Sequence, residues 1–287
     1  MEWRCRKGDC METIYLNQDT LTYWQGKAKR SVAALGFFDG IHKGHQHVIQ
    51  SASQIAKRKN LSLSVMSFFP HPKEVISNGK KQVRYLMPLS EKEKRLRELG
   101  VDMFYLVEFS KEFASLLPSQ FVAQYLSNLG VVHAVAGFDF SYGYKGTGHM
   151  DRLKKDSFGL IDVTKVEKLA VHGEKISSTL IREKLMKGEV EELPYLLGRT
   201  YEVECVWDGN VLELLPYYTL PASGCYEVLL KNQTESIQTK MIVSETVDGL
   251  TLTCLSEIPS FMTGGLSVVW LQRSIEGHYQ WSERISL

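Results

Sequence analysis

Short apolar runs that alternate with helical segments do most to limit the folds open to this chain. The runs lie near residues 31–36, 61–68, 101–108, 131–136 and 160–166. Segments between them, such as 90–99 and 118–129, have the spacing of amphipathic helices. Continuous apolar runs of this length are typical of strands buried in a parallel sheet, and parallel strands need helical crossovers. The order therefore predicts an α/β fold with a doubly wound parallel sheet.

The segment Gly36–Gln46 follows the first run and places His42 and His45 three residues apart. Beyond Gly44 the sequence takes helical spacing, so both imidazoles are expected at a helix N-terminus, where unpaired N–H groups and the helix dipole favour anions. An imidazole there can offset the charge that builds during phosphoryl or nucleotidyl transfer. The alternatives are ordinary caps or surface histidines; a zinc site is disfavoured because only His47 offers a third close ligand.

Three further segments combine unusual side chains at the ends of runs or at a helix start. Phe68–Pro72 has two prolines and aromatic rings, an edge that suits a flat aromatic ligand. Gly137–Gly146 joins glycines and rings to Asp139, which could bind a ribose hydroxyl or a metal-bound water. Ile176–Arg182 opens a helix with three hydroxyl residues and no capping box, so we expect those hydroxyls to be available to an anion.

Each segment alone has an ordinary explanation: an X-Pro turn, a glycine loop or a Ser/Thr N-cap. Their shared position changes this interpretation, because ligands of open α/β sheets bind outside the carboxyl ends of the strands. We therefore expect the segments to form one site.

In this order, the four segments resemble the adenylyltransferase half of the bacterial bifunctional riboflavin kinase/FAD synthetase family. The resemblance covers roughly the first two thirds of the chain and includes Leu89–Lys92 and Leu99–Asp102. It implies a Rossmann-like nucleotidyltransferase domain of the H-x-G-H type. It also implies FMN adenylylation, in which AMP passes from ATP to FMN to give FAD and pyrophosphate, with Mg²⁺ accompanying ATP.

The resemblance also implies roles for individual residues, although it assigns no metal ligand. Two departures stand out: Phe69 replaces a residue that is usually polar, and Tyr142 replaces a common phenylalanine. By similarity, the catalytic residues would be His42, His45 and Arg182. Those that bind ATP or the leaving pyrophosphate would be Gly36, Phe37, Asp39, Gly44, Gly137, Asp139, Ser177, Ser178 and Thr179. Those that bind flavin would be Phe68, Pro70, His71, Pro72 and Tyr142.

The last third of the chain departs from the family. Leu197–Tyr201 resembles the opening of the riboflavin kinase domain, and Pro221–Tyr226 resembles a later strand of it. Between them, Trp207–Pro216 lacks the kinase's Gly-Phe-Pro-Thr-Ala-Asn motif, and the later glutamate has no convincing counterpart. We therefore expect a small β-barrel-like domain without kinase activity, with strands near 201–207, 226–231 and 250–255.

The expected organisation is an adenylyltransferase domain at 11–188 and a degenerate kinase-like domain at 189–287, which begins with a short linker helix. We expect residues 1–10 to be a disordered extension. Of the 34 basic and 33 acidic residues, 5 and 14 follow Gly188, which gives the first part a formal charge of +10 and the second −9. A basic first domain attracts ATP and FMN. Nucleic acid is disfavoured because no nucleic-acid module is present, and Lys57–Lys59 and Lys92–Lys94 are typical of solvated helix faces.

The expected partners are ATP and FMN, with no nucleic acid, membrane or obligate protein partner. The sequence has no long apolar stretch and no secretory signal pattern, so we expect a cytoplasmic protein whose five cysteines are reduced. Two other functions stay open. One is a different H-x-G-H nucleotidyltransferase that uses a pantetheine phosphate or nicotinate mononucleotide. The other is a flavin sensor without catalysis.

Overall fold

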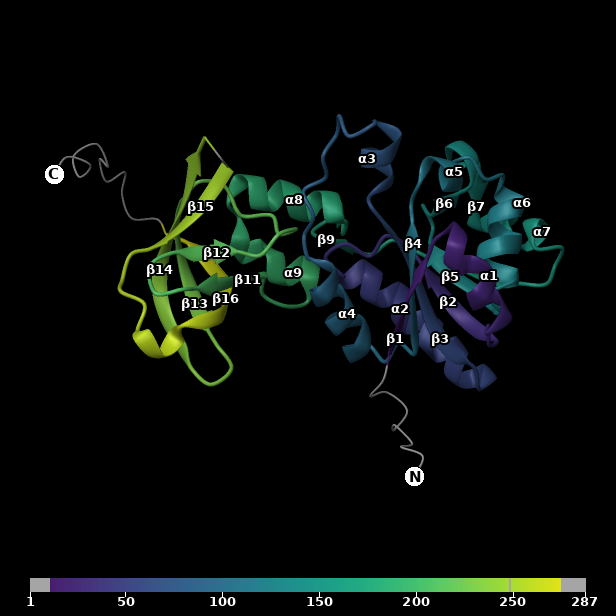
Figure 1. Cartoon of the computed structure of the whole chain (residues 1–287), viewed down its shortest axis with the longest axis horizontal. Coiled ribbons are helices and arrows are strands. Elements are labelled where there is room, and N and C mark those ends of the chain that lie inside the picture. Colours follow the sequence, from purple (N-terminus) through teal and green to yellow (C-terminus); the bar gives the residue numbers. More distant parts are fainter. Residues whose placement is uncertain (1–10, 248, 275–287) are drawn as a thin grey trace, which may run out of the picture. The chain divides into compact units, whose positions relative to one another are not determined.

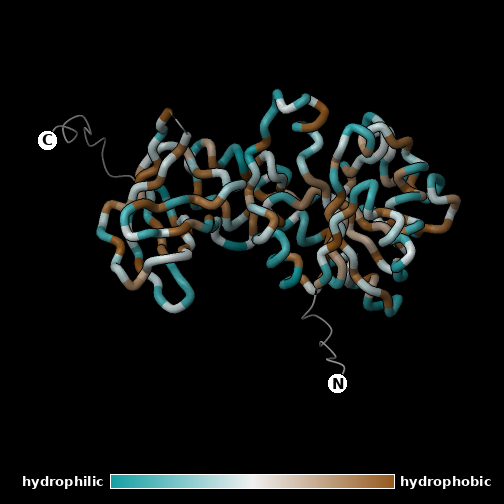
Figure 2. The backbone as a smooth tube through the Cα atoms, in the orientation of Figure 1, coloured by the Kyte–Doolittle hydropathy of each residue, from teal (hydrophilic) through white to brown (hydrophobic). Residues whose placement is uncertain are grey.

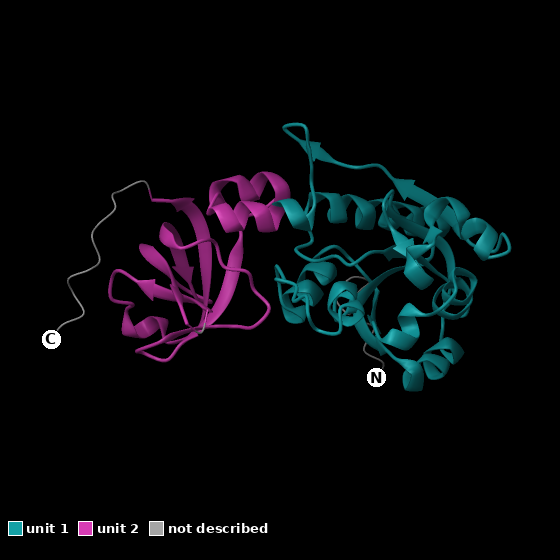
Figure 3. Ribbon diagram, turned by 90° about the horizontal axis from the view of Figure 1, so that it is seen from above, with its two compact units in different colours: residues 1–180 teal, residues 181–287 magenta. Residues whose placement is uncertain are grey.

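The computed structural model describes residues 11–247 and 249–274, which belong to two compact units (Figures 1 and 3). The first unit covers residues 1–180 and the second covers 181–287. The expected disordered extension, residues 1–10, lies outside the described residues. Helix α8 (Ser178–Lys187) runs across the division, and the domain boundary that we predicted at Gly188 lies just after its last residue.

The first unit is built on a six-stranded sheet in which every neighbouring pair is parallel. Its order is β1-β4-β3-β2-β5-β8, so the doubly wound parallel sheet that we predicted is confirmed. The strands are β1 (Glu12–Leu16), β2 (Ser31–Leu35), β3 (Ser62–Phe69), β4 (Met103–Glu108), β5 (Val131–Gly137) and β8 (Asp162–Val166). The main helices are α1 (Gln18–Gly26), α2 (Lys43–Lys59), α3 (Pro72–Ile76), α4 (Leu89–Glu98), α5 (Lys111–Ala114), α6 (Pro118–Phe121) and α7 (Met150–Asp156).

The strand order reverses between β2 and β5. From β2 the chain moves outward to β3 and β4, whereas β5 and β8 lie on the other side of β2. All five side chains of β2 are buried, as expected for the centre of a sheet covered on both faces. Hydrophobic residues of these strands are brown in Figure 2. The loops after β2 and β5 therefore flank the topological switch point, where ligands of such folds bind.

Two elements differ from our expectations. The strand β1 was not predicted, because only Ile14 and Leu16 of it are buried while Tyr15 is 57% exposed, so its apolar signal is that of an edge strand. The helix expected at 118–129 begins as α6 but continues as the π-helical segment η1 (Val122–Ser127). The small elements of this unit are β6 (Ser141–Tyr142), η2 (Tyr144–Gly146), β7 (Gly148–His149), β9 (Ala170–Val171) and β10 (Glu174–Lys175).

The second unit contains an antiparallel six-stranded sheet in the order β12-β11-β16-β13-β14-β15. Its end strands β12 and β15 contact each other, so the sheet is nearly closed, and the predicted barrel-like domain is confirmed. The strands are β11 (Glu202–Trp207), β12 (Leu212–Leu214), β13 (Gly224–Lys231), β14 (Ser236–Thr246), β15 (Gly249–Cys254) and β16 (Gly264–Arg273). The short helices are η3 (Val190–Glu192), α9 (Leu193–Leu197) and η4 (Ser260–Met262).

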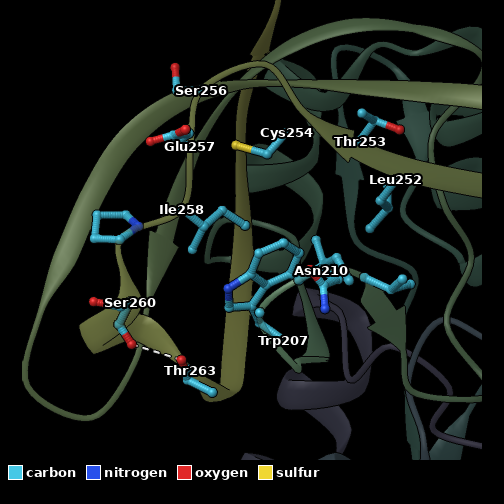
Figure 4. A pocket seen from close by; sticks show the side chains of 14 residues that line it. Trp207, Asn210, Leu252, Thr253, Cys254, Ser256, Glu257, Ile258, Ser260 and Thr263 are labelled. Carbon is cyan, nitrogen blue, oxygen red and sulfur yellow. Dashed lines mark hydrogen bonds between the residues drawn. The ribbon is translucent and has the colours of Figure 1, made fainter.

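A hollow of about 1060 Å³ opens in this second unit (Figure 4). Trp207, Asn210, Leu252, Cys254 and Glu257 are among the residues that line it. Trp207 and Asn210 belong to the segment Trp207–Pro216, in which we found no kinase motif. No helix within residues 11–247 and 249–274 combines the length and the apolar character needed to cross a membrane.

Candidate active site

The N-terminus of α2 holds the two histidines that the sequence singled out. His42 is the N-cap, and its Nδ1 accepts a hydrogen bond of 3.2 Å from the backbone N–H of His45. The two rings stack with their centroids 3.6 Å apart and their planes 18° apart. Because Nδ1 is an acceptor, neutral His42 carries its proton on Nε2, which can donate to an anion. We call His42, Gly44 and His45 the phosphate corner.

Burial holds the pKa of His45 well below its usual range, and positive charge on His42, Lys92 and Lys175 lowers that pKa further. The Nδ1 atom of His45 is buried and has no hydrogen-bond partner among the residues that the structure describes. Buried polar atoms without a partner are uncommon in folded proteins, and a bound ligand would explain the position of this Nδ1 atom. His45 is thus a neutral imidazole at physiological pH.

Glycines give the phosphate corner its space. A Cβ atom at Gly44 would lie 3.1 Å from the imidazole of His42, and one at Gly36 would lie 2.9 Å from the ring of Phe38. Phe38 and Ile41 have positive φ angles of 54° and 37° although both carry buried side chains. Backbone strain of this kind persists where the surroundings fix it, and it clusters at ligand sites.

Asp39 braces the loop between β2 and α2. Its side chain is 1% exposed, and its two carboxylate oxygens accept the backbone N–H of Leu86 at 3.0 and 3.2 Å. Its carbonyl oxygen accepts the hydroxyl of Ser178 at 2.8 Å. Asp39 therefore ties two distant segments to the phosphate corner, while its expected contact with the nucleotide stays a prediction.

The hydroxyl residues before and in α8 are less available than we expected. The Oγ of Ser177 accepts the backbone N–H of Leu180 at 3.1 Å, which is an N-cap interaction that needs no capping box. Ser178 donates to Asp39, so two of the three hydroxyls already have backbone partners. Thr179 is exposed, and Arg182 follows Ser178 by about one helical turn on α8.

Aromatic rings line the end of β3. The ring of Phe37 contacts that of His71 edge-on at 4.3 Å and lies 6.2 Å from that of Tyr85, which in turn lies 5.8 Å from that of Phe69. The Nδ1 of His71 accepts the backbone N–H of Lys73, so this imidazole caps α3. Pro70 follows a cis peptide bond, and Pro72 is the first residue of α3. We call Phe37, Phe69, His71 and Tyr85 the aromatic wall.

Two side chains that we expected at the flavin surface lie in the core. Phe68 is 8% exposed and packs against Phe109 and Phe113. Tyr142 is 5% exposed, and its hydroxyl donates to Asp156 at 2.7 Å. Burial raises the pKa of Tyr142, and the hydrogen bond to Asp156 raises it further. Their expected contact with flavin therefore stays a prediction, while the exposed ring at the end of β3 is that of Phe69, 38% exposed.

The loop that follows Gly137 at the end of β5 is tied to the hairpin of β9 and β10. Asp139 forms an ion pair with Lys175 of β10, and the Lys175 ammonium lies 4.6 Å from the ring centroid of Phe138. No pattern in the sequence predicts this contact, because the two residues are 36 positions apart along the chain. It brings a positive charge near His45, as the lowered pKa of that imidazole reflects.

A sequence model of the FAD synthetase family matches residues 25–180, which is more than half of the chain. The chain belongs to the FAD synthetase family. The matched region contains the phosphate corner, the aromatic wall and the hydroxyls of Ser177 and Ser178, and it ends before Arg182.

Several relatives support this membership. The chain is 50% identical over 192 residues to a bifunctional riboflavin kinase/FMN adenylyltransferase of Listeria monocytogenes, which covers 67% of this chain and 60% of the relative. It is 45% identical over 194 residues to the Bacillus subtilis protein of the same name. This match covers 68% of this chain and 61% of the relative. A FAD synthetase from L. monocytogenes is 33% identical over 201 residues, across 70% and 81%. The chain thus spans about three fifths of the length of the two bifunctional relatives.

A crystal structure described as a macrolide-efflux protein from Streptococcus pneumoniae has a similar fold. The TM-score is 0.79 at 28% identity, and the likeness covers 91% of this chain and 90% of that one. It extends well beyond the region that the FAD synthetase family model matches.

One residue of this family member overturns an expectation. We expected Lys92–Lys94 to be a solvated helix face, but Lys92 is 6% exposed. It contacts the loop that leads from β2 to the phosphate corner. Its Nζ donates to the carbonyl oxygen of Phe37 at 3.1 Å, with the hydroxyl oxygen of Ser67 at 3.4 Å. Burial lowers the pKa of Lys92 to about 8, and the charge of Asp39 opposes that shift.

Metal ligands do not gather at this site. Within the part of the chain that the structure describes, no cluster of three or more His, Cys, Asp or Glu residues could hold a metal ion. The nearby carboxylates are engaged elsewhere, since Asp39 binds the Leu86 N–H and Asp139 pairs with Lys175. The residues present therefore do not fit a resident metal held by the protein alone.

Proposed function

We propose that this chain is an FMN adenylyltransferase that transfers AMP from ATP to FMN, giving FAD and pyrophosphate. The observation that carries the proposal is the stacked pair of His42 and His45 at the N-terminus of α2, beside the switch point of a parallel sheet. An anion at that point meets helix N–H groups and one imidazole donor. The family membership supports the same reaction.

In this proposal, a phosphate oxygen of FMN attacks the α-phosphorus of ATP. The new O–P bond forms as the bond from the α-phosphorus to the pyrophosphate oxygen breaks. No covalent intermediate with the protein is needed, so the protein aligns the substrates and offsets charge. His42 donates from Nε2 to a phosphate oxygen, and His45 offers a second imidazole to the phosphates. Gly36, Gly44 and Gly137 let the backbone approach the nucleotide closely.

The remaining roles follow the same division. The pyrophosphate lies against Ser177, Ser178, Thr179 and Arg182, with Ser178 contributing its backbone N–H because its hydroxyl donates to Asp39. The isoalloxazine ring lies against the aromatic wall. Mg²⁺ enters bound to the ATP phosphates, because hard cations of this kind are commonly held by substrate phosphates with few protein ligands.

We further propose that the second unit has no riboflavin kinase activity. Its hollow is lined by 14 residues that include one acid, Glu257, and no lysine, arginine or histidine (Figure 4). A triphosphate in such a pocket would meet a like charge and no cation. This argues against phosphoryl transfer there, although the bifunctional relatives carry both activities in their names.

Two parallel reactions test the proposal: the full chain with ATP and Mg²⁺, and either FMN or riboflavin, with the products separated by chromatography. We expect FAD from FMN and no product from riboflavin. Formation of FMN from riboflavin would refute the absence of kinase activity. No product in either reaction would refute adenylylation and favour a flavin sensor.

A further inference from the structure

Lys92 is a buried lysine whose nearest acidic influence, the charge of Asp39, acts without a direct ion pair. Its side chain lies on α4, is 6% exposed, and makes no ion pair with a carboxylate among the described residues. Removing an ammonium from water is costly unless other groups compensate, and a methionine of similar length would pack there at less cost. The charge of Asp39, which is also buried, offsets part of this cost, but no carboxylate of the described residues pairs with the ammonium directly.

The contacts of Lys92 converge on one residue of the site. Its Nζ donates to the Phe37 carbonyl at 3.1 Å and also lies 5.0 Å from the centroid of the Phe37 ring. The hydroxyl of Ser67 on β3 donates to the same Phe37 carbonyl at 2.7 Å. Both the backbone and the ring of Phe37 are thus held from the side of α4 and β3.

Phe37 joins the two halves of the site. It lies in the loop that leads from β2 to His42, and its ring packs edge-on against His71 of the aromatic wall. A shift of Phe37 would therefore move the phosphate corner and the aromatic wall relative to each other. Reactions that depend on alignment are sensitive to such shifts, and a displacement of about 1 Å can cost about a hundredfold in rate.

We propose that Lys92 is a positioning residue for adenylyl transfer. Its ammonium fixes Phe37 and thereby holds the phosphate corner and the aromatic wall in their relative positions. This inference rests on the proposed function. Lys92 acts through Phe37 and needs no contact with the reacting atoms.

The test compares Lys92→Met with Lys94→Met, measured as kcat and KM for FMN in the FAD-forming reaction. Lys94 lies on the same helix, but its side chain is 55% exposed, so it is a matched control. We expect Lys92→Met to lower kcat/KM at least about tenfold with an unchanged or higher Tm, and Lys94→Met to stay within about twofold. A third variant, Lys92→Gln, keeps an N–H donor for Phe37 without the charge and should restore part of the loss.

The outcomes separate this inference from the proposed function. If the unaltered chain makes no FAD, the proposed function and the role of Lys92 are both wrong. If it makes FAD and Lys92→Met does so equally well, only the role of Lys92 is wrong. If Lys92→Met lowers Tm and activity in parallel, and Lys92→Gln restores neither, Lys92 is a structural residue and the inference is overturned.

A measurement without substrate tests the same inference. The charges that lower the pKa of His45 are those of His42 at the start of the same helix, Lys92 on α4 and Lys175 on β10. In Lys92→Met one of the repelling charges is gone, so the pKa of His45, followed by NMR of its imidazole, should rise. A His45 titration identical to that of the unaltered chain would contradict the proposed position of the ammonium.

Discussion

Two imidazoles stacked 3.6 Å apart cannot both be protonated without strong repulsion. Burial and the charges of Lys92 and Lys175 leave His45 as the neutral member, while His42 keeps Nδ1 occupied by the His45 N–H. The pair therefore presents a directed donor on His42 and an uncharged ring beside it. Negative charge from a bound triphosphate would make protonation of this pair less unfavourable, which couples the histidines to their ligand.

We expect His45→Ala to lower kcat for FAD formation at least about tenfold while the affinity for FMN stays near that of the unaltered chain. The reason is that an interaction used mainly in the transition state affects kcat more than ground-state binding. Steady-state kinetics and equilibrium flavin fluorescence measure the two quantities. His47→Ala, which changes an exposed histidine two residues later, is the control. An unchanged kcat for His45→Ala would refute the role.

The burial of Lys92 predicts a stability effect with a defined pH dependence. Below about pH 8 its amine is charged in both the folded and the unfolded chain, so the cost of burial is present in full. Between about pH 8 and the usual lysine pKa of about 10.4, the unfolded chain binds the proton and the folded chain does not, so the unaltered chain gains stability with pH.

We therefore expect Lys92→Met to raise the free energy of unfolding at pH 7 by about 1–3 kcal/mol, and the difference to shrink as the pH approaches 10. Urea unfolding of both chains at pH 7 and at about pH 9.5 measures it. A loss of stability at pH 7 would mean that the contacts of Lys92 with Phe37 and Ser67 outweigh the cost of the buried charge.

For single residues, the sequence indicated which side chains could be functional better than it indicated what surrounds them. The spacing of His42 and His45 is visible in the chain, because the helix that follows fixes their geometry. The difference between Lys92 and Lys94 is not visible: both occupy one helix, and only the packing of α4 against the Phe37 loop buries the first. The burial of Tyr142 is not visible for the same reason, since its partner Asp156 lies on a later helix.

Among the elements, the strand ends and the loops after them build the site. The apolar runs located β2, β3, β4 and β5, because buried parallel strands have a continuous hydrophobic signal. The run near 160–166 also located β8, although only Val166 of that edge strand is buried. The edge strand β1 lacks that signal, and Tyr15 points its ring to solvent. The strands β9 and β10 have two residues each, too few for a periodic signal, so the ion pair of Lys175 with Asp139 could be found only from the fold.

The aromatic wall gives a prediction about flavin binding. We expect Phe69→Ala to weaken FMN binding by about 1–2 kcal/mol through lost ring contact, since Phe69 is the exposed ring at the end of β3. Tyr142→Phe is the matched comparison: it should leave FMN affinity unchanged and lower stability by about 1–2 kcal/mol, because Asp156 loses a buried hydrogen bond. Fluorescence quenching and urea unfolding measure the two effects. The reverse pattern would place the flavin against the loop of Tyr142.

For the whole molecule, the opposite charges of the two parts of the chain bear on substrate capture. The part up to Gly188 has a formal charge of +10 and the part after it −9, values that the near-neutral total conceals. A basic region attracts anionic substrates over distances of about the Debye length, roughly 10 Å at 0.1 M salt.

We expect the KM for ATP to rise at least about threefold between about 50 mM and 500 mM KCl, with a smaller change in kcat, because salt screens attraction more than it alters the assembled site. Initial rates at constant Mg²⁺ measure this. A KM that does not depend on salt would mean that the local contacts of the phosphate corner dominate binding. Lys94→Met, which removes one exposed charge, should change the salt dependence only slightly.

The pairing of β2 with β5 has a consequence for folding. Ser31 lies opposite Val131 across this central pair, so the sheet closes only after segments far apart along the chain have met. Such long-range parallel pairing is slow. Before the two strands pair, the loops that follow them do not lie side by side, and the nucleotide site does not exist. A nucleotide can then bind only the completed sheet and shifts the folding equilibrium toward it by mass action. Under the proposed function, ATP and FMN would therefore raise the free energy of unfolding of this chain in addition to serving as its substrates.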